Sequence, residues 1–130
     1  MKAPEIPVSW GEVIDKITIL EIKTVRLKNA AARANVGREL SLLREKVHPQ
    51  IAARADIQAL VAGLKAVNEA LWDIENLIRD KESKAEFGAD FVTLARSVYK
   101  RNDERAAIKN DINRLLGSDI IEEKCYQPAP

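Results

Sequence analysis

A long heptad pattern in the middle of the chain constrains the fold more than any other feature. Between Asp56 and Glu82, apolar residues recur at alternating intervals of three and four, which places them on one stripe of a helix. The residues of this stripe are Ile57, Leu60, Leu64, Val67, Leu71, Ile74 and Ile78. A helix of this length would be roughly 40 Å long. Other segments must pack along it, so the pattern predicts the long central helix of an all-α bundle.

The first helix begins at a clear N-terminal signal. Ser9 and Glu12 have the spacing of a capping box. Apolar residues in the segment that follows cover an arc of roughly 220° around the helix, so other elements should nearly surround it. The sequence therefore predicts an extended segment over residues 1–8 and a helix from Trp10 to Leu27.

A second helix is expected between the first helix and the central one. Asn29 can end the first helix and cap the second, which would extend to about Val47. The pair His48-Pro49 should stop it, because the residue before a proline avoids helical dihedral angles. A short connection or a single helical turn should then lead to the central helix.

The last helix should fold back against the central one. Residues 84–90 predict a tight turn, after which a helix runs from about Ala89 to Leu116. Residues 118–130 form a tail that is too short to be a domain. We therefore expect residues 1–130 to form a single antiparallel bundle of three to four helices.

Composition excludes several classes of function. The chain has 130 residues, of which 46% are hydrophobic and 32% charged, and its net charge is +1. So small a charge gives no general attraction to nucleic acid or to an anionic membrane. No apolar run approaches the ~20 residues of a membrane span, and no signal peptide is recognisable. One cysteine and one histidine cannot form a disulfide or a Cys/His metal site. We expect a cytoplasmic protein without nucleic acid, metal or cofactor.

Polar residues on helix faces that should be apolar mark the candidate functional region. These residues are Arg101, Arg105 and Lys109 on the last helix, Asn68, Trp72, Glu75 and Arg79 on the central helix, and Glu21 on the first helix. Arg105 lies nearly at the centre of the inner stripe of its helix. Because an unpaired guanidinium inside the bundle would cost several kcal/mol, it should be partly buried and paired with a carboxylate.

Two interpretations of this region stay open. In the structural one, Arg101 and Lys109 extend from the rim to solvent, and Arg105 pairs with Glu21 or Glu75 to fix the helix register. In the functional one, the three cations form a pocket for the carboxylate or phosphate group of a ligand.

The functional interpretation involves three further side chains. Asn102 or Asn68 would add hydrogen bonds to the ligand, and Trp72 would supply a wall of the pocket. A solvent-connected pocket lined by Arg105 would favour the ligand, whereas a closed and paired Arg105 would favour the structural role.

The roles of the two tryptophans and the cysteine are simpler to interpret. Trp10 and Trp72 are either core residues or anchors of an interface, since tryptophan is enriched at binding hot spots. The wide apolar arc of the first helix favours a homodimer. Cys125 lacks a neighbouring base that would activate it, and no pattern identifies catalytic residues.

Five blocks of the sequence resemble a bacterial family of short proteins classed as a domain of unknown function. The blocks are VSWGE at 8–12, IDKITILEIK at 14–23, NEALWDIE at 68–75, LARSVY at 94–99 with Asn102-Asp103, and Arg105-Ala106 with Lys109. The resemblance spans nearly the whole chain, and its tail departs from the family pattern at Cys125, where serine is expected. It implies a bacterial cytoplasmic setting, because members tend to lie near or be fused to polysaccharide or glycosyltransferase functions.

The sequence therefore leaves two functions open. The first is a helical interaction module, a homodimer that binds a partner protein, linked through the resemblance to cell-surface polysaccharide assembly. The second is a small helical enzyme or binding protein whose cations, with Glu21 and Glu75, hold an anionic metabolite.

Overall fold

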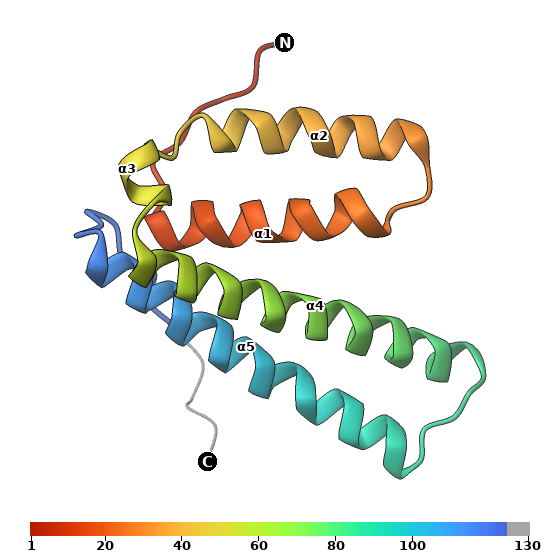
Figure 1. Ribbon diagram of the computed structural model, residues 1–130. Coiled ribbons are helices and arrows are strands. Elements are labelled where there is room, and N and C mark those ends of the chain that lie inside the picture. The colour runs from red at the N-terminus through yellow and green to blue at the C-terminus, as the bar shows by residue number, and fades with distance from the viewer. Residues whose placement is uncertain (125–130) are drawn as a thin grey trace.

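The computed structural model describes residues 1–124, and these form helices and connecting loops without any strand. The helices are α1 (Trp10–Arg26), α2 (Ala30–Arg44), α3 (Pro49–Ala52), α4 (Ala55–Ser83) and α5 (Ala89–Leu115). Two antiparallel hairpins, α1–α2 and α4–α5, are joined through the short α3 (Figure 1). The predicted all-α bundle is confirmed, and its longest helix is α4, with 29 residues.

Local capping sets where the N-terminal helices begin. Ser9 Oγ accepts a hydrogen bond of 3.2 Å from the N–H of Glu12, and α1 starts at Trp10, directly after Ser9, as the capping motif predicted. Asn29 Oδ1 caps α2 in the same way, at 2.9 Å from the N–H of Ala32. His48 Nδ1 accepts from the N–H of the residue two positions later, at 3.1 Å, and so caps α3. Each start is therefore specified by a side chain just before the helix.

The core lies where α1, α4 and α5 meet. Its centre consists of Ile14, Ile57, Leu64 and Ile112, all buried. Among the described helices, α2 packs only against α1, on the side away from the α4–α5 hairpin (Figure 1). Three helices thus enclose the core, and α2 forms an outer layer that covers the remaining face of α1.

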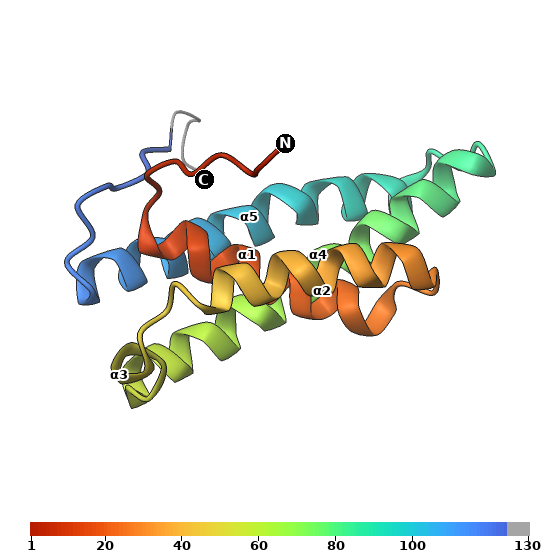
Figure 2. The same ribbon diagram turned by 90° about the horizontal axis from the view of Figure 1, so that it is seen from above.

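The bundle opens toward one end. On α4 the buried residues end at Asn68, and on α5 they begin only at Lys109. Beyond these points α4 and α5 continue as a pair, which we call the distal arm (residues 69–104). The arm diverges from the α1–α2 hairpin and extends past it (Figures 1 and 2). Only part of the heptad stripe is therefore covered by a third helix.

The loop at the tip of the distal arm contains a strained residue. Ala85 has a φ of 54°, in the left-handed region, at the end of α4. The N–H of Glu86 donates to the carbonyl of Lys81 at 2.9 Å, and the N–H of Ala85 to that of Glu82 at 3.0 Å, which completes a Schellman cap. Glycine is the usual residue at the left-handed position, but Gly88 follows later and caps α5 with a φ of −78°.

Replacing Ala85 with glycine should stabilise the fold by about 1 kcal/mol, because glycine adopts a left-handed conformation without the steric cost that alanine incurs. Chemical denaturation of the variant measures this gain. As a control, Ala66→Gly on the exposed side of α4 should lose about 1 kcal/mol through helix propensity. Losses at both positions would contradict the assignment of strain to Ala85.

Candidate functional site

A buried carboxylate lies at the contact between α1, α4 and α5. Asp15 on α1 is 1% exposed. Its Oδ1 accepts hydrogen bonds from Asn68 Nδ2 at 2.9 Å and from Arg105 Nε at 3.0 Å, and its Oδ2 accepts from Arg105 Nη2. Binding through two nitrogens fixes the plane of the guanidinium. The hydrogen bond to Asp15 raises the pKa of Arg105 above its already high value, so the guanidinium stays charged.

Thr18 completes the hydrogen bonding around this carboxylate. The second hydrogen of Asn68 Nδ2 is donated to Thr18 Oγ1 at 2.9 Å, and the Thr18 hydroxyl donates to the backbone carbonyl of Asp15 at 2.7 Å. Thr18 and Asn68 are themselves buried. Such a network is favourable only when its members are satisfied together, so it specifies how the three helices sit against one another.

The prediction that Arg105 pairs with Glu21 or Glu75 is wrong. Neither Glu21 nor Glu75 holds its guanidinium, since Glu21 pairs with Arg44 of α2 at 2.9 Å and the carboxylate at Arg105 is Asp15. The reason lies in the phase of α1. Six residues separate Asp15 from Glu21, which turns Glu21 by about 240° around the helix, onto the face that α2 covers.

A second ion-pair cluster joins α1 and α5 one turn further along. Lys109 Nζ lies 2.7 Å from Glu12 Oε2 and 2.8 Å from Glu122 Oε2, and Lys109 is buried. Burial acts to lower the pKa of Lys109, but the hydrogen bonds to both carboxylates outweigh it, so the pKa is raised. The contact with Glu122, together with an ion pair between Lys124 and Asp103, holds the C-terminal tail on α5.

The backbones of α1 and α5 come into direct contact at Gly11. A Cβ at this position would lie 2.5 Å from the carbonyl oxygen of Lys109, closer than any side chain can approach. The N–H of Gly11 donates to Asn113 Oδ1 at 2.6 Å, and the N–H of Trp10 to Ser118 Oγ at 3.3 Å. Groups from α5 and its tail thus satisfy N–H donors that a helix start leaves unpaired.

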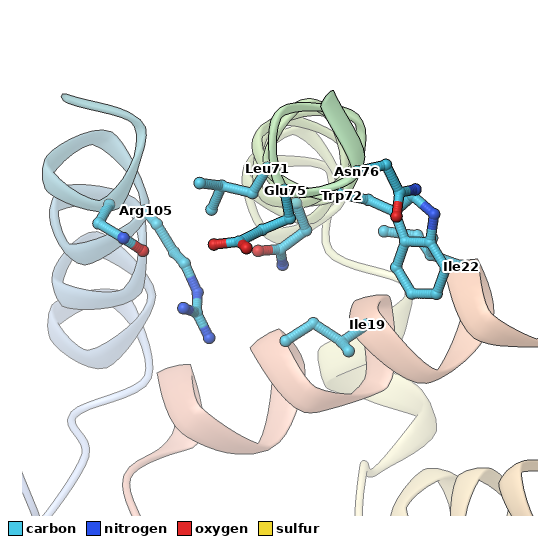
Figure 3. A pocket seen from close by; sticks show the side chains of 9 residues that line it. Ile19, Ile22, Leu71, Trp72, Glu75, Asn76 and Arg105 are labelled. Atoms are coloured by element: carbon cyan, nitrogen blue, oxygen red, sulfur yellow. The ribbon is translucent and has the colours of Figure 1, made fainter. Parts of the chain in front are cut away.

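A cleft of about 450 Å³ opens beside Arg105, where the distal arm leaves α1. Its lining combines apolar side chains, three asparagines and two opposite charges. The lining residues are Ile19, Ile22, Asn68, Leu71, Trp72, Glu75, Asn76, Asn102 and Arg105. Figure 3 shows Arg105 extending from α5 and Glu75 from α4 toward the same space, while Trp72 and Asn76 lie toward Ile22 of α1.

The structure brings together part of the predicted anion-binding set. Arg105, Asn102 and Asn68 all line the cleft, and Trp72 forms one of its walls. The pocket expected beside Arg105 is therefore present in the fold, although Arg105 is also paired with Asp15. The cleft that favours ligand binding and the ion pair that favours a structural role therefore occur at the same residue, Arg105.

The other two predicted cations do not line the cleft. Arg101 is exposed and lies 3.1 Å from Glu104, and Lys109 is enclosed by its two carboxylates. Successive positions at intervals of four rotate by about 40° around a helix, so Arg101 and Lys109 point about 80° apart. Only Arg105, between them, faces the cleft.

The remaining predicted residues take other positions. Trp10 is partly buried and packs against the core at the start of α1. Glu75 lines the cleft, and Glu21 does not. Cys125 lies outside the described residues. Within residues 1–124, no cluster of three or more acidic, histidine or cysteine side chains has the geometry to hold a metal, and no helix has the length and apolarity needed to cross a membrane.

Sequence reasoning missed the central residue of the site, Asp15. The signal was available only in part, because Thr18 is a polar position within the apolar arc of the first helix, as Glu21 is, while Asp15 lies about 20° beyond the edge of the arc at Ile22. The polar positions of that arc could have been separated only by knowing which neighbouring helix covers each face. That knowledge is not contained in the pattern of one helix.

The fold and the site define a class of small all-α proteins, built from two hairpins around a buried arginine–carboxylate cluster with a cleft beside it. Residues 4–130 match the family model described as a family of unknown function (DUF6165), and the chain belongs to this family. The resemblance seen in the sequence is thereby confirmed. Comparisons with curated proteins and with solved structures found no match.

Arg105→Ala should lower the free energy of unfolding by about 3 kcal/mol, because it leaves the buried Asp15 carboxylate without its main partner. The double variant Asp15→Leu/Arg105→Leu should recover much of this loss. Denaturant unfolding of Asp15→Leu, Arg105→Leu and the double variant gives the coupling energy. Arg101→Ala, one turn away and exposed, should change stability by less than about 0.5 kcal/mol. Equal effects at positions 101 and 105 would show that the Asp15 pair contributes nothing specific.

Glu122 should make the docking of the tail dependent on pH. Its hydrogen bond to Lys109 holds the pKa of Glu122 below the usual value. The folded carboxyl therefore binds a proton less readily than the unfolded one, so the contact stabilises the fold at neutral pH and weakens as the pH falls through the lowered pKa.

Thermal melts of the parent and Glu122→Gln should accordingly differ near neutral pH, and the difference should shrink below about pH 4.5. Glu123→Gln, at the neighbouring exposed position, serves as the control and should follow the parent throughout. A difference that grew on acidification would have the wrong sign for this contact.

Proposed function

We propose that the protein binds a small metabolite in the cleft through a carboxylate or phosphate group held by Arg105. The observation that carries this proposal is the state of the Arg105 side chain. It is 29% exposed and oriented by Asp15 through Nε and Nη2, while Nη1 has no partner within residues 1–124. A guanidinium carries five N–H donors in a fixed plane. Those not used by Asp15 remain for a ligand.

The surroundings of Arg105 support the same proposal. Its orientation is fixed before any ligand arrives, so binding would cost little side-chain entropy. Asn102 and Asn68 add amide groups to the lining, and Ile19 and Leu71 add apolar surface. A volume of about 450 Å³ is that of an ordinary small-molecule site. The polar groups can donate and accept hydrogen bonds, and the apolar side chains exclude water. This combination supports binding as the function.

A binding assay tests the proposal directly. Small dicarboxylates and phosphate esters should raise the melting temperature of the parent, and calorimetry should give their affinity. Asn102→Asp places a negative charge in the cleft and should weaken binding at least about tenfold. Arg101→Ala removes a positive charge that lies outside the cleft and should leave the affinity unchanged. Equal losses in the two variants would indicate general charge attraction and would contradict a site at Arg105.

A second candidate function, an interaction module that forms a homodimer, is favoured by the distal arm. The sequence argument for a dimer relied on the wide apolar arc of α1, but α2, α4 and α5 cover that helix within one chain. Val25 of α1 is still exposed, but four exposed apolar side chains lie on the arm. They are Leu77, Phe87, Val92 and Tyr99. The link to polysaccharide assembly stays a prediction from the resemblance.

If the arm forms a homodimer, light scattering should give twice the chain mass at micromolar concentration. Leu77→Glu and Val92→Lys should then restore the monomer mass, because each places a charge in an apolar contact. Val25→Lys, at an exposed apolar residue of α1, is the matched control and should stay dimeric. A monomer mass for the parent across this range would refute the homodimer.

A further inference from the structure

Two opposite charges face the same cleft without pairing with each other. Arg105 on α5 forms its salt bridge with Asp15. Glu75 on α4 forms its described salt bridge with Arg79 of the same helix, at 3.8 Å. That distance is too long for a good hydrogen bond, and the Glu75 side chain is 49% exposed, so the contact contributes little. The Glu75 carboxylate therefore remains available to a ligand.

The two side chains come from different walls of the cleft. Figure 3 shows Arg105 extending from α5 and Glu75 from α4, with Ile19 of α1 below the space between them. A molecule in this space would therefore contact a guanidinium on one side and a carboxylate on the other. The relation between the two groups is set by the packing of two helices and not by a flexible loop.

The arrangement of charge favours a ligand that also carries a cation over one that is only anionic. Arg105 and Arg79 contribute two positive charges, and their salt-bridge partners Asp15 and Glu75 contribute two negative charges, so the charges around the cleft sum to zero. Asp15 holds Arg105 closely, whereas Arg79 lies 3.8 Å from Glu75, so Glu75 is the group with the weaker partner. An anion would add a further negative charge beside Glu75, whereas a ligand that also carries a cation would compensate it.

We infer that the ligand is a zwitterion, a small free amino acid, with its carboxylate at Arg105 and its ammonium group at Glu75. This inference rests on the proposed function and names the chemical class of ligand for the same site. The rest of the amino acid lies against the apolar part of the lining, Leu71 and Trp72. Asn102, which also lines the cleft, supplies an amide hydrogen bond to the carboxylate.

The test compares each amino acid with its two half-molecules. The full chain is titrated by calorimetry at neutral pH with a panel of free amino acids, and each one that binds is compared with the acid that lacks the ammonium group and the amine that lacks the carboxylate. The amino acid should bind at least about tenfold more tightly than either analogue, because the acid leaves Glu75 without an ammonium group and the amine leaves the free N–H donors of Arg105 without an acceptor.

Glu75→Gln separates the two ends of the ligand. This variant should lose about tenfold in affinity for the amino acid and should bind the acid analogue at least as tightly as the parent does, since it removes the partner of the ammonium group and a negative charge beside the acid. Glu75 is half exposed on the distal arm, so the variant should fold like the parent. Glu82→Gln, an exposed position further along α4, is the matched control and should bind like the parent.

The outcomes distinguish this inference from the proposed function. An acid or phosphate that binds as tightly as every amino acid would overturn the zwitterion and leave the anion site at Arg105 standing. Tighter binding of the amino acid that is unaffected by Glu75→Gln would also overturn the assignment of the ammonium site. A chain that binds no amino acid, acid or phosphate would overturn both.

Discussion

The buried carboxylate of Asp15 is the interaction on which the arrangement of the core helices depends. It belongs to α1 and receives hydrogen bonds from Asn68 of α4 and Arg105 of α5, so one group connects three helices. An ionised group in the interior is strongly unfavourable unless it is paired. A shift of α5 by one turn would move Arg105 away and leave the carboxylate alone. The pair thus favours one register among the many that apolar packing alone would tolerate.

The helices could be predicted because their signals are local. The cap at Ser9 and the unbroken stripe from Ile57 to Ile78 each lie within one segment of chain, and α1 and α4 follow them. The pairing of charges is not local. The inner position of Arg105 was predictable, but its partner depended on α2 covering the face of α1 that carries Glu21. The strain at Ala85 could not be predicted either, because the glycine of this turn, Gly88, lies three residues after the left-handed position.

Charged residues on inner helix faces serve here mainly to join helices. Glu12 has the position of the second residue of a capping box, yet its carboxylate binds Lys109 of α5. Glu12 and Asp15 on α1 thus meet Lys109 and Arg105 on α5 as two successive pairs, at a spacing that Gly11 makes possible by allowing close backbone contact. Of the three cations predicted to bind an anion, only Arg105 has both a structural partner and access to the cleft, and the sequence pattern alone could not separate it from the other two.

The opening of the bundle beyond Asn68 places the cleft at a boundary of local stability. One wall belongs to the three-helix core, and the other, with Trp72 and Glu75, belongs to the arm, in which none of residues 69–104 is buried. Local unfolding that begins at the tip of the arm can reach this wall without disturbing Asp15. Amide hydrogens of the arm should therefore exchange with solvent sooner than those near Leu64. A molecule that bridges the two walls would slow this exchange, so occupancy of the cleft and order in the arm are coupled.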